Sequence, residues 1–194
     1  MSFGLILPIA LSAAVPSLSV PPIEIHAPPP VSQSLEQRLA SRLADLKAAE
    51  TEDDALLISA DVRSIWRQQA GPTADLLLSR ARLAIEVEDF ATAERSFFHL
   101  RQLEPDYAEG WVASAAHAMT QSDWSFALEA LSTAVTLDAN RFDAWTMLGQ
   151  ALERADAREA ALEAYGEALA LYPFSPAARR GYQRLEDELA GRAL

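Results

Sequence analysis

The sequence contains no cysteine, which excludes disulfide bonds, thiol nucleophiles and cysteine-ligated zinc sites. Histidine is also scarce, and His26, His99 and His117 lie far apart in the chain. A helical zinc site needs two histidines four residues apart, and no pair has this spacing. We therefore expect no metal site, and we expect each histidine to be a surface or hydrogen-bonded side chain.

Nucleotide-binding and catalytic loops are missing as well. The sequence has no Gly-x-Gly-x-x-Gly, no phosphate loop and no Gly-x-Ser-x-Gly. Acidic clusters such as Asp53-Asp54 and Glu186-Asp187-Glu188 could support acid–base chemistry only inside a cleft. Their places at helix ends or on polar faces favour a solvated surface instead. We therefore expect that the protein is not an enzyme and that it binds no cofactor.

Positive charge is in short supply. Lysine and arginine together number 16 against 28 aspartates and glutamates, and the formal net charge is −12. An acidic surface repels phosphate groups. Nucleic acid is therefore an unfavourable partner, and an anionic membrane surface is disfavoured for the same reason.

Residues 1–31 differ from the rest of the chain. This segment holds seven of the eleven prolines, and its stretch from Phe3 to Val15 is mostly apolar. Small residues after this stretch fit a signal-peptidase site, although no lysine or arginine precedes it. The stretch is too short and too rich in proline to span a membrane as a helix. It is interpreted either as a secretory signal followed by a proline-rich linker, or as a disordered apolar tail.

Three consecutive units of 34 residues follow one pattern without an insertion: 74–107, 108–141 and 142–175. Small residues at positions eight and twenty would let two helices approach closely, and a large residue at position twenty-four would fill the gap to the next pair. Trp111 and Trp145 occupy the fourth position and are therefore expected to be packing residues. Positions eight, twenty and twenty-four are Ala81, Ala93 and Phe97 in the first unit, Ala115, Ala127 and Leu131 in the second, and Gly149, Ala161 and Tyr165 in the third.

This pattern resembles the tetratricopeptide repeat (TPR) over residues 74–175. The resemblance implies an all-α, right-handed superhelical solenoid of three repeats. Residues 32–73, with a capping box at Ser34 and Gln37 and a stop at Gly71-Pro72, predict a leading helical hairpin. We interpret this hairpin as a degenerate or capping repeat over the open apolar end of the array. Residues 176–194 predict a carboxyl-terminal helix with a polar outer surface.

The resemblance also implies a binding groove on the concave face, lined by the fifth, ninth and twelfth positions of each first helix. Arg82 is the only cation among these positions, which argues against the carboxylate clamp of some TPR proteins. Two alternatives remain: the amino-terminal arm or leading helix fills part of the groove, and Arg82 pairs with a neighbouring acid. The predicted groove residues are Leu78, Arg82, Ile85, Val112, Ala116, Met119, Thr146, Gln150 and Glu153.

These features predict a protein–protein interaction scaffold or adaptor that holds a peptide or helix of a protein partner in its groove. The first alternative is a self-associating assembly subunit. The second is an accessory protein that holds a small ligand in an apolar cavity lined by Leu78, Val112 and Met119. The protein would be a monomer or part of a complex. The junction from Ile65-Trp66 to Gly71-Pro72-Thr73 also resembles small exported alphaproteobacterial TPR proteins. This resemblance implies a periplasmic setting, with the cytoplasm as the alternative.

Overall fold

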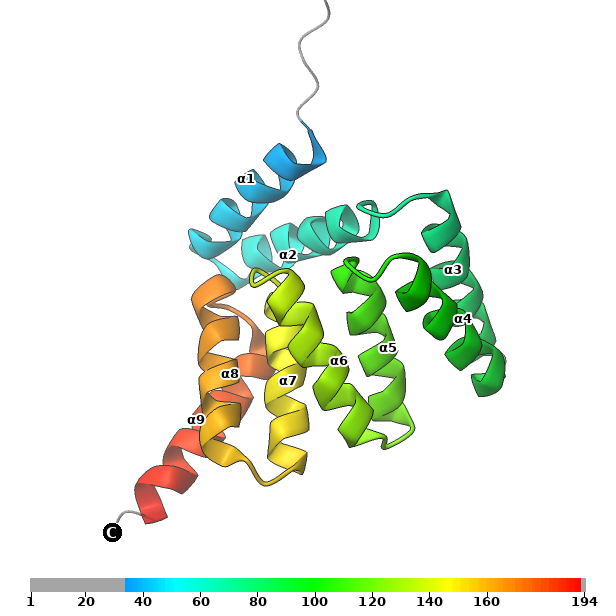
Figure 1. Ribbon diagram of the computed structural model, residues 1–194. Coiled ribbons are helices and arrows are strands. Elements are labelled where there is room, and N and C mark those ends of the chain that lie inside the picture. Colours follow the sequence, from blue (N-terminus) through cyan, green and yellow to red (C-terminus); the bar gives the residue numbers. More distant parts are fainter. Residues whose placement is uncertain (1–33, 193–194) are drawn as a thin grey trace, which may run out of the picture. The chain divides into compact units, whose positions relative to one another are not determined.

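The computed structural model describes residues 34–192, and this part of the chain consists of nine α-helices without a strand (Figure 1). The predicted all-α class is therefore confirmed. The signal-like segment predicted for residues 1–31 lies outside the described residues. No helix in the described range is both long and apolar enough to cross a bilayer. The helices are α1 (Leu35–Lys47), α2 (Glu52–Arg67), α3 (Pro72–Glu86), α4 (Phe90–Leu103), α5 (Ala108–Thr120), α6 (Trp124–Leu137), α7 (Phe142–Arg154), α8 (Arg158–Leu171) and α9 (Pro176–Arg192).

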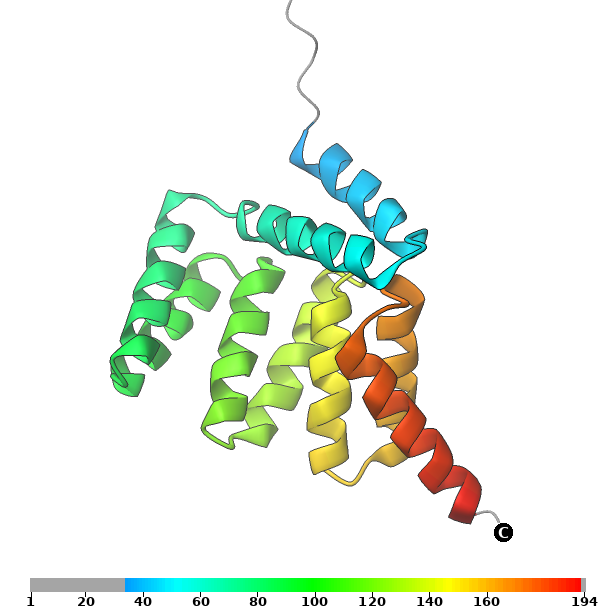
Figure 2. The same ribbon diagram turned by 180° about the vertical axis from the view of Figure 1, so that it is seen from behind.

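The three repeats are the hairpins α3–α4, α5–α6 and α7–α8, which stack in chain order and are followed by α9. Figure 1 shows the second helices α4, α6 and α8, and Figure 2 shows α5, α7 and α9 on the opposite face. Ala93, Ala127 and Ala161 each have 0% exposed surface. The predicted tight junctions between the two helices of each repeat therefore recur at the expected spacing.

One left-handed residue closes the turn inside each repeat. Glu88, Ser122 and Asp156 have φ angles of 58°, 61° and 59°, and they are spaced 34 residues apart. Residues other than glycine rarely adopt this backbone conformation. In the first two repeats the next residue is Asp89 or Asp123. Its carboxylate accepts a hydrogen bond from a backbone N–H in the first turn of the second helix and so caps that helix.

In α5, α7 and α9 the residue at position four donates a hydrogen bond to the backbone of the preceding repeat. The Trp111 indole N–H donates to the backbone carbonyl six residues earlier at 2.7 Å, and Trp145 makes the same bond at 3.0 Å. Arg179 of α9 donates to the equivalent carbonyl at 2.9 Å. Both tryptophans pack half-buried against the core, in agreement with their predicted role.

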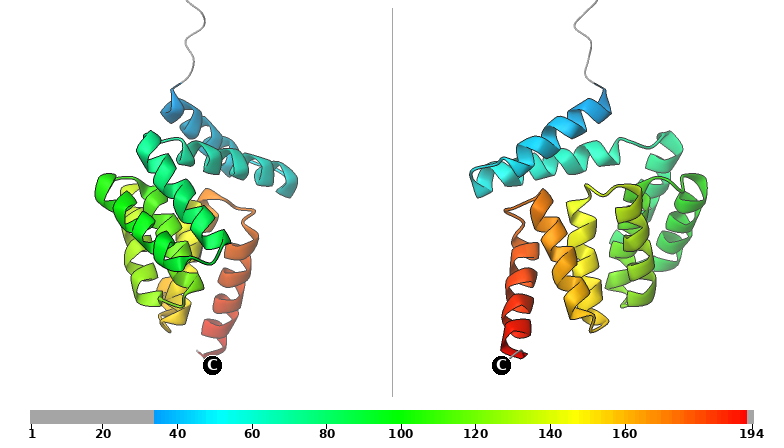
Figure 3. Two further views of the ribbon diagram at one scale, coloured as in Figure 1. Left: turned by 90° about the vertical axis from the view of Figure 1, so that its right-hand side faces the viewer. Right: turned by 60° about the vertical axis from the view of Figure 1, so that its left-hand side comes forward.

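The α1–α2 hairpin forms with the predicted capping box at Ser34, but it does not cap the first repeat. Instead α2 crosses the amino-terminal ends of α5 and α7 (Figure 3). Trp66 is buried there against Phe142 with ring centroids 5.1 Å apart, and Phe142 contacts Tyr172 at 5.2 Å. Large aromatic side chains dominate packing energetics, and this aromatic cluster holds the hairpin away from α3. The prediction that the hairpin covers the open end of the array is therefore wrong.

Candidate functional site

The first helices α3, α5 and α7 form one face of the molecule (Figure 2). The surface of this face that holds two pockets is called the groove. Seven of the nine predicted groove residues line two pockets on this face. The other two are buried: Leu78 belongs to the core of the first repeat, and the Thr146 hydroxyl donates to the Phe142 carbonyl at 2.7 Å. Val112 and Met119 line different pockets. The single cavity expected for a small ligand is therefore not formed.

The first pocket, which we call the α2 pocket, has a volume of about 330 Å³. Its floor is apolar and comes from α3 and α5, with Ile85, Val112 and Ala116 in the predicted positions. The helix α2 covers one end and adds Arg63 and Arg67 to the predicted Arg82. The helix α2 thus borders one end of the groove, and the amino-terminal arm of the same alternative lies outside the described residues. Three arginines and an apolar floor make this pocket suitable for an apolar group beside a negative charge.

Acidic side chains in the α2 pocket are already paired. Arg82 donates to Glu109 at 3.1 Å, so the predicted pairing of Arg82 with an acid is correct. The buried Arg141 donates to Glu109 at 2.8 Å and to Asp143 at 2.7 Å, and its guanidinium lies 4.2 Å from the centre of the Trp66 ring. Burial opposes the charge on Arg141, but its bonds to Asp143 and the charges of Asp143 and Glu109 prevail and raise the pKa of the guanidinium. The network therefore joins α3, α5 and α7 under α2.

The second pocket, which we call the α9 pocket, has a volume of about 390 Å³ and lies where α5, α7 and α9 meet. Glu153 accepts bonds from the Tyr165 hydroxyl, at 2.7 Å, and from Arg184. The Arg154 guanidinium lies 5.0 Å from the centre of the Trp124 ring. The pocket is lined by Met119, Trp124, Gln150, Glu153, Arg154, Tyr165, Ala177, Arg180, Gly181 and Arg184.

Comparison with known proteins gives no matching family model and no matching curated protein. Solved structures do match. The first TPR domain of Spaghetti (RPAP3) superposes with a TM-score of 0.59 and 17% identity over 62% of this chain and 96% of that one. The Sgt2 TPR domain from Aspergillus fumigatus has a TM-score of 0.58 and 21% identity over 63% of this chain and 83% of that one. The MamA protein has a TM-score of 0.58 and 23% identity over 62% of this chain and 66% of that one. The chain has the fold of a TPR solenoid.

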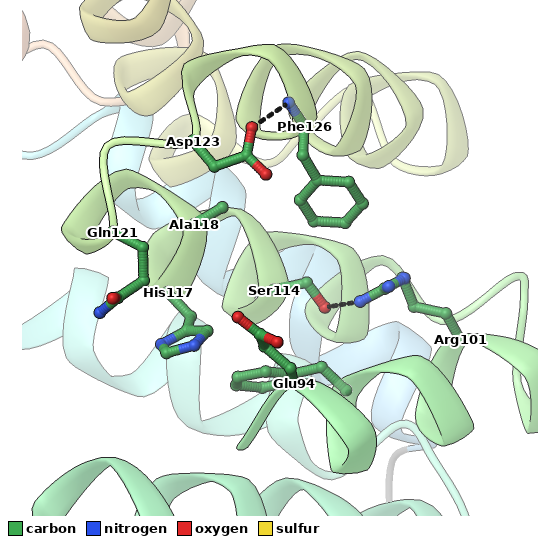
Figure 4. A pocket seen from close by; sticks show the side chains of 9 residues that line it. Glu94, Arg101, Ser114, His117, Ala118, Gln121, Asp123 and Phe126 are labelled. Carbon is green, nitrogen blue, oxygen red and sulfur yellow. Dashed lines mark hydrogen bonds between the residues drawn. The ribbon is translucent and has the colours of Figure 1, made fainter. Parts of the chain in front are cut away.

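A third pocket of this TPR solenoid lies between the first two repeats (Figure 4). Arg101 of α4 donates to the Ser114 hydroxyl at 2.5 Å across this junction. Burial lowers the pKa of Arg101, although the charge of Glu129 opposes this effect. His117 is 5% exposed beside the Phe97 ring, and in the described part of the chain neither of its ring nitrogens has a hydrogen-bond partner. The expectation of a surface or hydrogen-bonded histidine is therefore wrong for His117.

Sequence reasoning missed most of the groove arginines. Arg63 and Arg67 precede the repeats, so no repeat position assigns them to the groove. Arg180 and Arg184 belong to the last helix, for which the sequence predicts only a polar outer surface, but both line the α9 pocket. The sequence held one signal for these groove arginines: two arginines four residues apart occur in both α2 and α9, which places each pair on one side of its helix.

Proposed function

We propose that the protein is an interaction adaptor whose groove holds a partner segment with acidic side chains next to apolar ones. One observation carries this proposal: both pockets combine apolar side chains with three arginines, although the whole chain has a net charge of −12. Positive side chains concentrated in one groove of an acidic protein attract a negatively charged partner selectively.

Several of these arginines remain available to a partner. Glu109 and Asp143 are neutralised by Arg141 and Arg82. Within the described residues, no ion pair is formed by Arg63 and Arg67 in the α2 pocket or by Arg154 and Arg180 in the α9 pocket. Guanidinium groups bind carboxylates through two parallel hydrogen bonds, which adds geometric specificity to the attraction.

The groove is also organised before binding. Its floor belongs to stacked helices, and the Arg82–Glu109–Arg141–Asp143 network links three of them. A rigid surface loses little conformational entropy when it binds. The first TPR of Spaghetti was solved bound to an HSP90 peptide, SRMEEVD. This complex shares the fold of the present chain and supports a peptide or helix as the ligand.

We further propose an exported, envelope setting, based on the signal-like pattern of residues 1–31.

Selection from a random peptide library against the full chain tests the proposal. Selected peptides should be enriched in Asp and Glu beside apolar residues. Their affinity, measured by fluorescence anisotropy, should fall at least about tenfold with Arg67→Glu or Arg180→Glu, equivalent to about 1.4 kcal/mol. The matched control is Arg95→Glu on the outer helix α4, which should bind like the wild type. A library without binders, or equal affinities for Arg67→Glu, Arg180→Glu and Arg95→Glu, would refute the proposal.

A further inference from the structure

The first helix of each later unit buries one side against the unit before it. The third position is Gly110, Ala144 or Ala178, and all three are buried. The tenth position is His117, Ala151 or Leu185, with exposures of 5%, 0% and 2%. Their neighbours are on the preceding second helix: Gly110 lies against Leu100, His117 against Phe97, and Leu185 in the cluster of Ala161 and Tyr165. Positions three and ten therefore define the stacking side of a first helix.

On α3 the same side carries large aliphatic residues and is open. Leu76 and Leu83 occupy positions three and ten, and Val87, the C-cap residue directly after α3, occupies position fourteen; their exposures are 68%, 61% and 67%. We call these three residues the α3 stripe. Because the α1–α2 hairpin crosses the ends of α5 and α7 instead, α3 packs mainly on α4 at the end of the row opposite α9 (Figure 1). Ser79 and Arg80 separate Leu76 from Leu83, whereas Leu83 and Val87 lie one turn apart. Large aliphatic side chains exposed side by side in this way indicate an interaction surface.

We propose that the α3 stripe binds the α3 stripe of a second copy of this chain, with the two helices antiparallel about a twofold axis at Leu83. An interface of this type uses the same patch on both subunits, so the patch must be complementary to itself. The charges around Leu83 meet this condition. Arg80 lies three residues before Leu83 and Glu86 three residues after it, so each Arg80 is level with Glu86 of the second copy.

The charges of this helix also permit two copies to approach through it. The helix α3 carries two acids, Asp75 and Glu86, and two arginines, Arg80 and Arg82, so its charges balance while the chain carries −12. Two copies that approach through α3 therefore avoid much of their mutual repulsion. Within the described residues, neither Arg80 nor Glu86 forms an ion pair, so both are free for a second copy.

Packing at the axis is also feasible. In the antiparallel arrangement Leu83 faces Leu83 of the second copy, and Val87 is level with Ser79, whose small side chain leaves room for it. Helix axes in contact lie about 8–10 Å apart, which brings the two Leu83 side chains together. The second copy would thus cover the end of the α3 stripe that holds Leu83 and Val87, and Leu76 would be level with Phe90 of the second copy.

Light scattering and sedimentation of the full chain test this inference. We expect a dimer at micromolar concentration, and a monomer for Leu83→Asp. The matched control is Leu57→Asp on α2, where the leucine is 69% exposed and lies outside the α3 stripe. This control should remain dimeric. Arg80→Glu and Glu86→Arg should each weaken association about tenfold or more, and the double variant should restore it. A wild type that is monomeric at about 100 µM, a dimer that survives Leu83→Asp, or a double variant that fails to restore association overturns the proposal.

The absence of cysteine provides a second, geometric test. A Leu83→Cys variant has a single thiol, and at a twofold axis two such thiols should oxidise rapidly to a covalent dimer. Leu57→Cys serves as the control for random collisions. Equal crosslinking rates for the two variants would contradict the antiparallel arrangement, even if the protein were dimeric.

Discussion

The ring of Tyr165 lies between two glycines, and this arrangement gives a sharp prediction for Gly181→Ala. A Cβ atom on Gly149 of α7 would lie 2.7 Å from the ring, and one on Gly181 of α9 would lie closer still. The ring therefore packs directly against the backbones of both helices. It also lines the α9 pocket, where its hydroxyl donates to Glu153 at 2.7 Å.

The magnitude follows from two opposing effects. Replacing a glycine inside a helix by alanine stabilises it by about 1 kcal/mol. Overpacking a filled site costs about 1–3 kcal/mol, and carbon atoms prefer separations of about 3.5–4.0 Å. The ring cannot retreat from Gly181, because Gly149 lies on its other side and Glu153 holds its hydroxyl. We therefore expect the upper end of the cost and a net loss of about 1–2 kcal/mol for Gly181→Ala.

Urea unfolding followed by circular dichroism measures this loss. Gly166→Ala is the matched control, because its nearest atom on Tyr182 is at an ordinary 3.6 Å, and it should stabilise the protein by about 0.5–1 kcal/mol. Adding Tyr165→Leu to Gly181→Ala should remove most of the steric cost and show coupling between the two sites. If Gly181→Ala is as stable as the wild type, the steric reasoning is wrong.

Three further predictions concern buried polar groups. Glu109→Gln removes the partner of Arg82 and one partner of the buried Arg141, and should cost about 1–3 kcal/mol in the free energy of unfolding. Asp156→Asn, at an exposed pair with Arg158, should cost less than about 1 kcal/mol; equal losses would contradict a central role for Glu109. His117→Phe replaces an unpartnered imidazole and should raise the free energy of unfolding by about 1 kcal/mol or more, and a decrease would mean that the imidazole has a partner. Burial raises the pKa of both Tyr107 and Tyr165. Their contribution to stability is therefore complete below the unfolded pKa of about 10 and is lost as pH rises above it. Absorbance of tyrosinate should accompany unfolding in this range, and full ionisation without unfolding would refute the burial effect.

Much of the groove could be predicted from the repeat, because helical periodicity decides which side chains share a direction. Seven predicted residues line the two pockets for this reason. Leu78 and Thr146 occupy the fifth position of their repeats, which is buried in all three repeats, and of these residues only Val112 lines a pocket. Periodicity sets the direction of a side chain, whereas its exposure depends on which neighbouring side chains cover it.

The environment of His117 shows the same limit. Its position in the repeat is a stacking position, yet the preceding helix presents the rings of Phe90 and Phe97 to it. Neither ring can accept a conventional hydrogen bond. The lack of partners is a property of two repeats together and cannot be read from either one.

The sequence by itself determined the nine helices of residues 34–192 and the register of the three repeats, because caps, small residues and the 34-residue period act over short distances along the chain. Only the tertiary structure decided where the leading hairpin lies, which arginines line the groove and which side of α3 stays open. Burial of Trp66 with Phe142 and Tyr172 placed the hairpin across α5 and α7. These residues lie far apart in sequence, and packing between such residues depends on their three-dimensional shapes rather than on a local pattern.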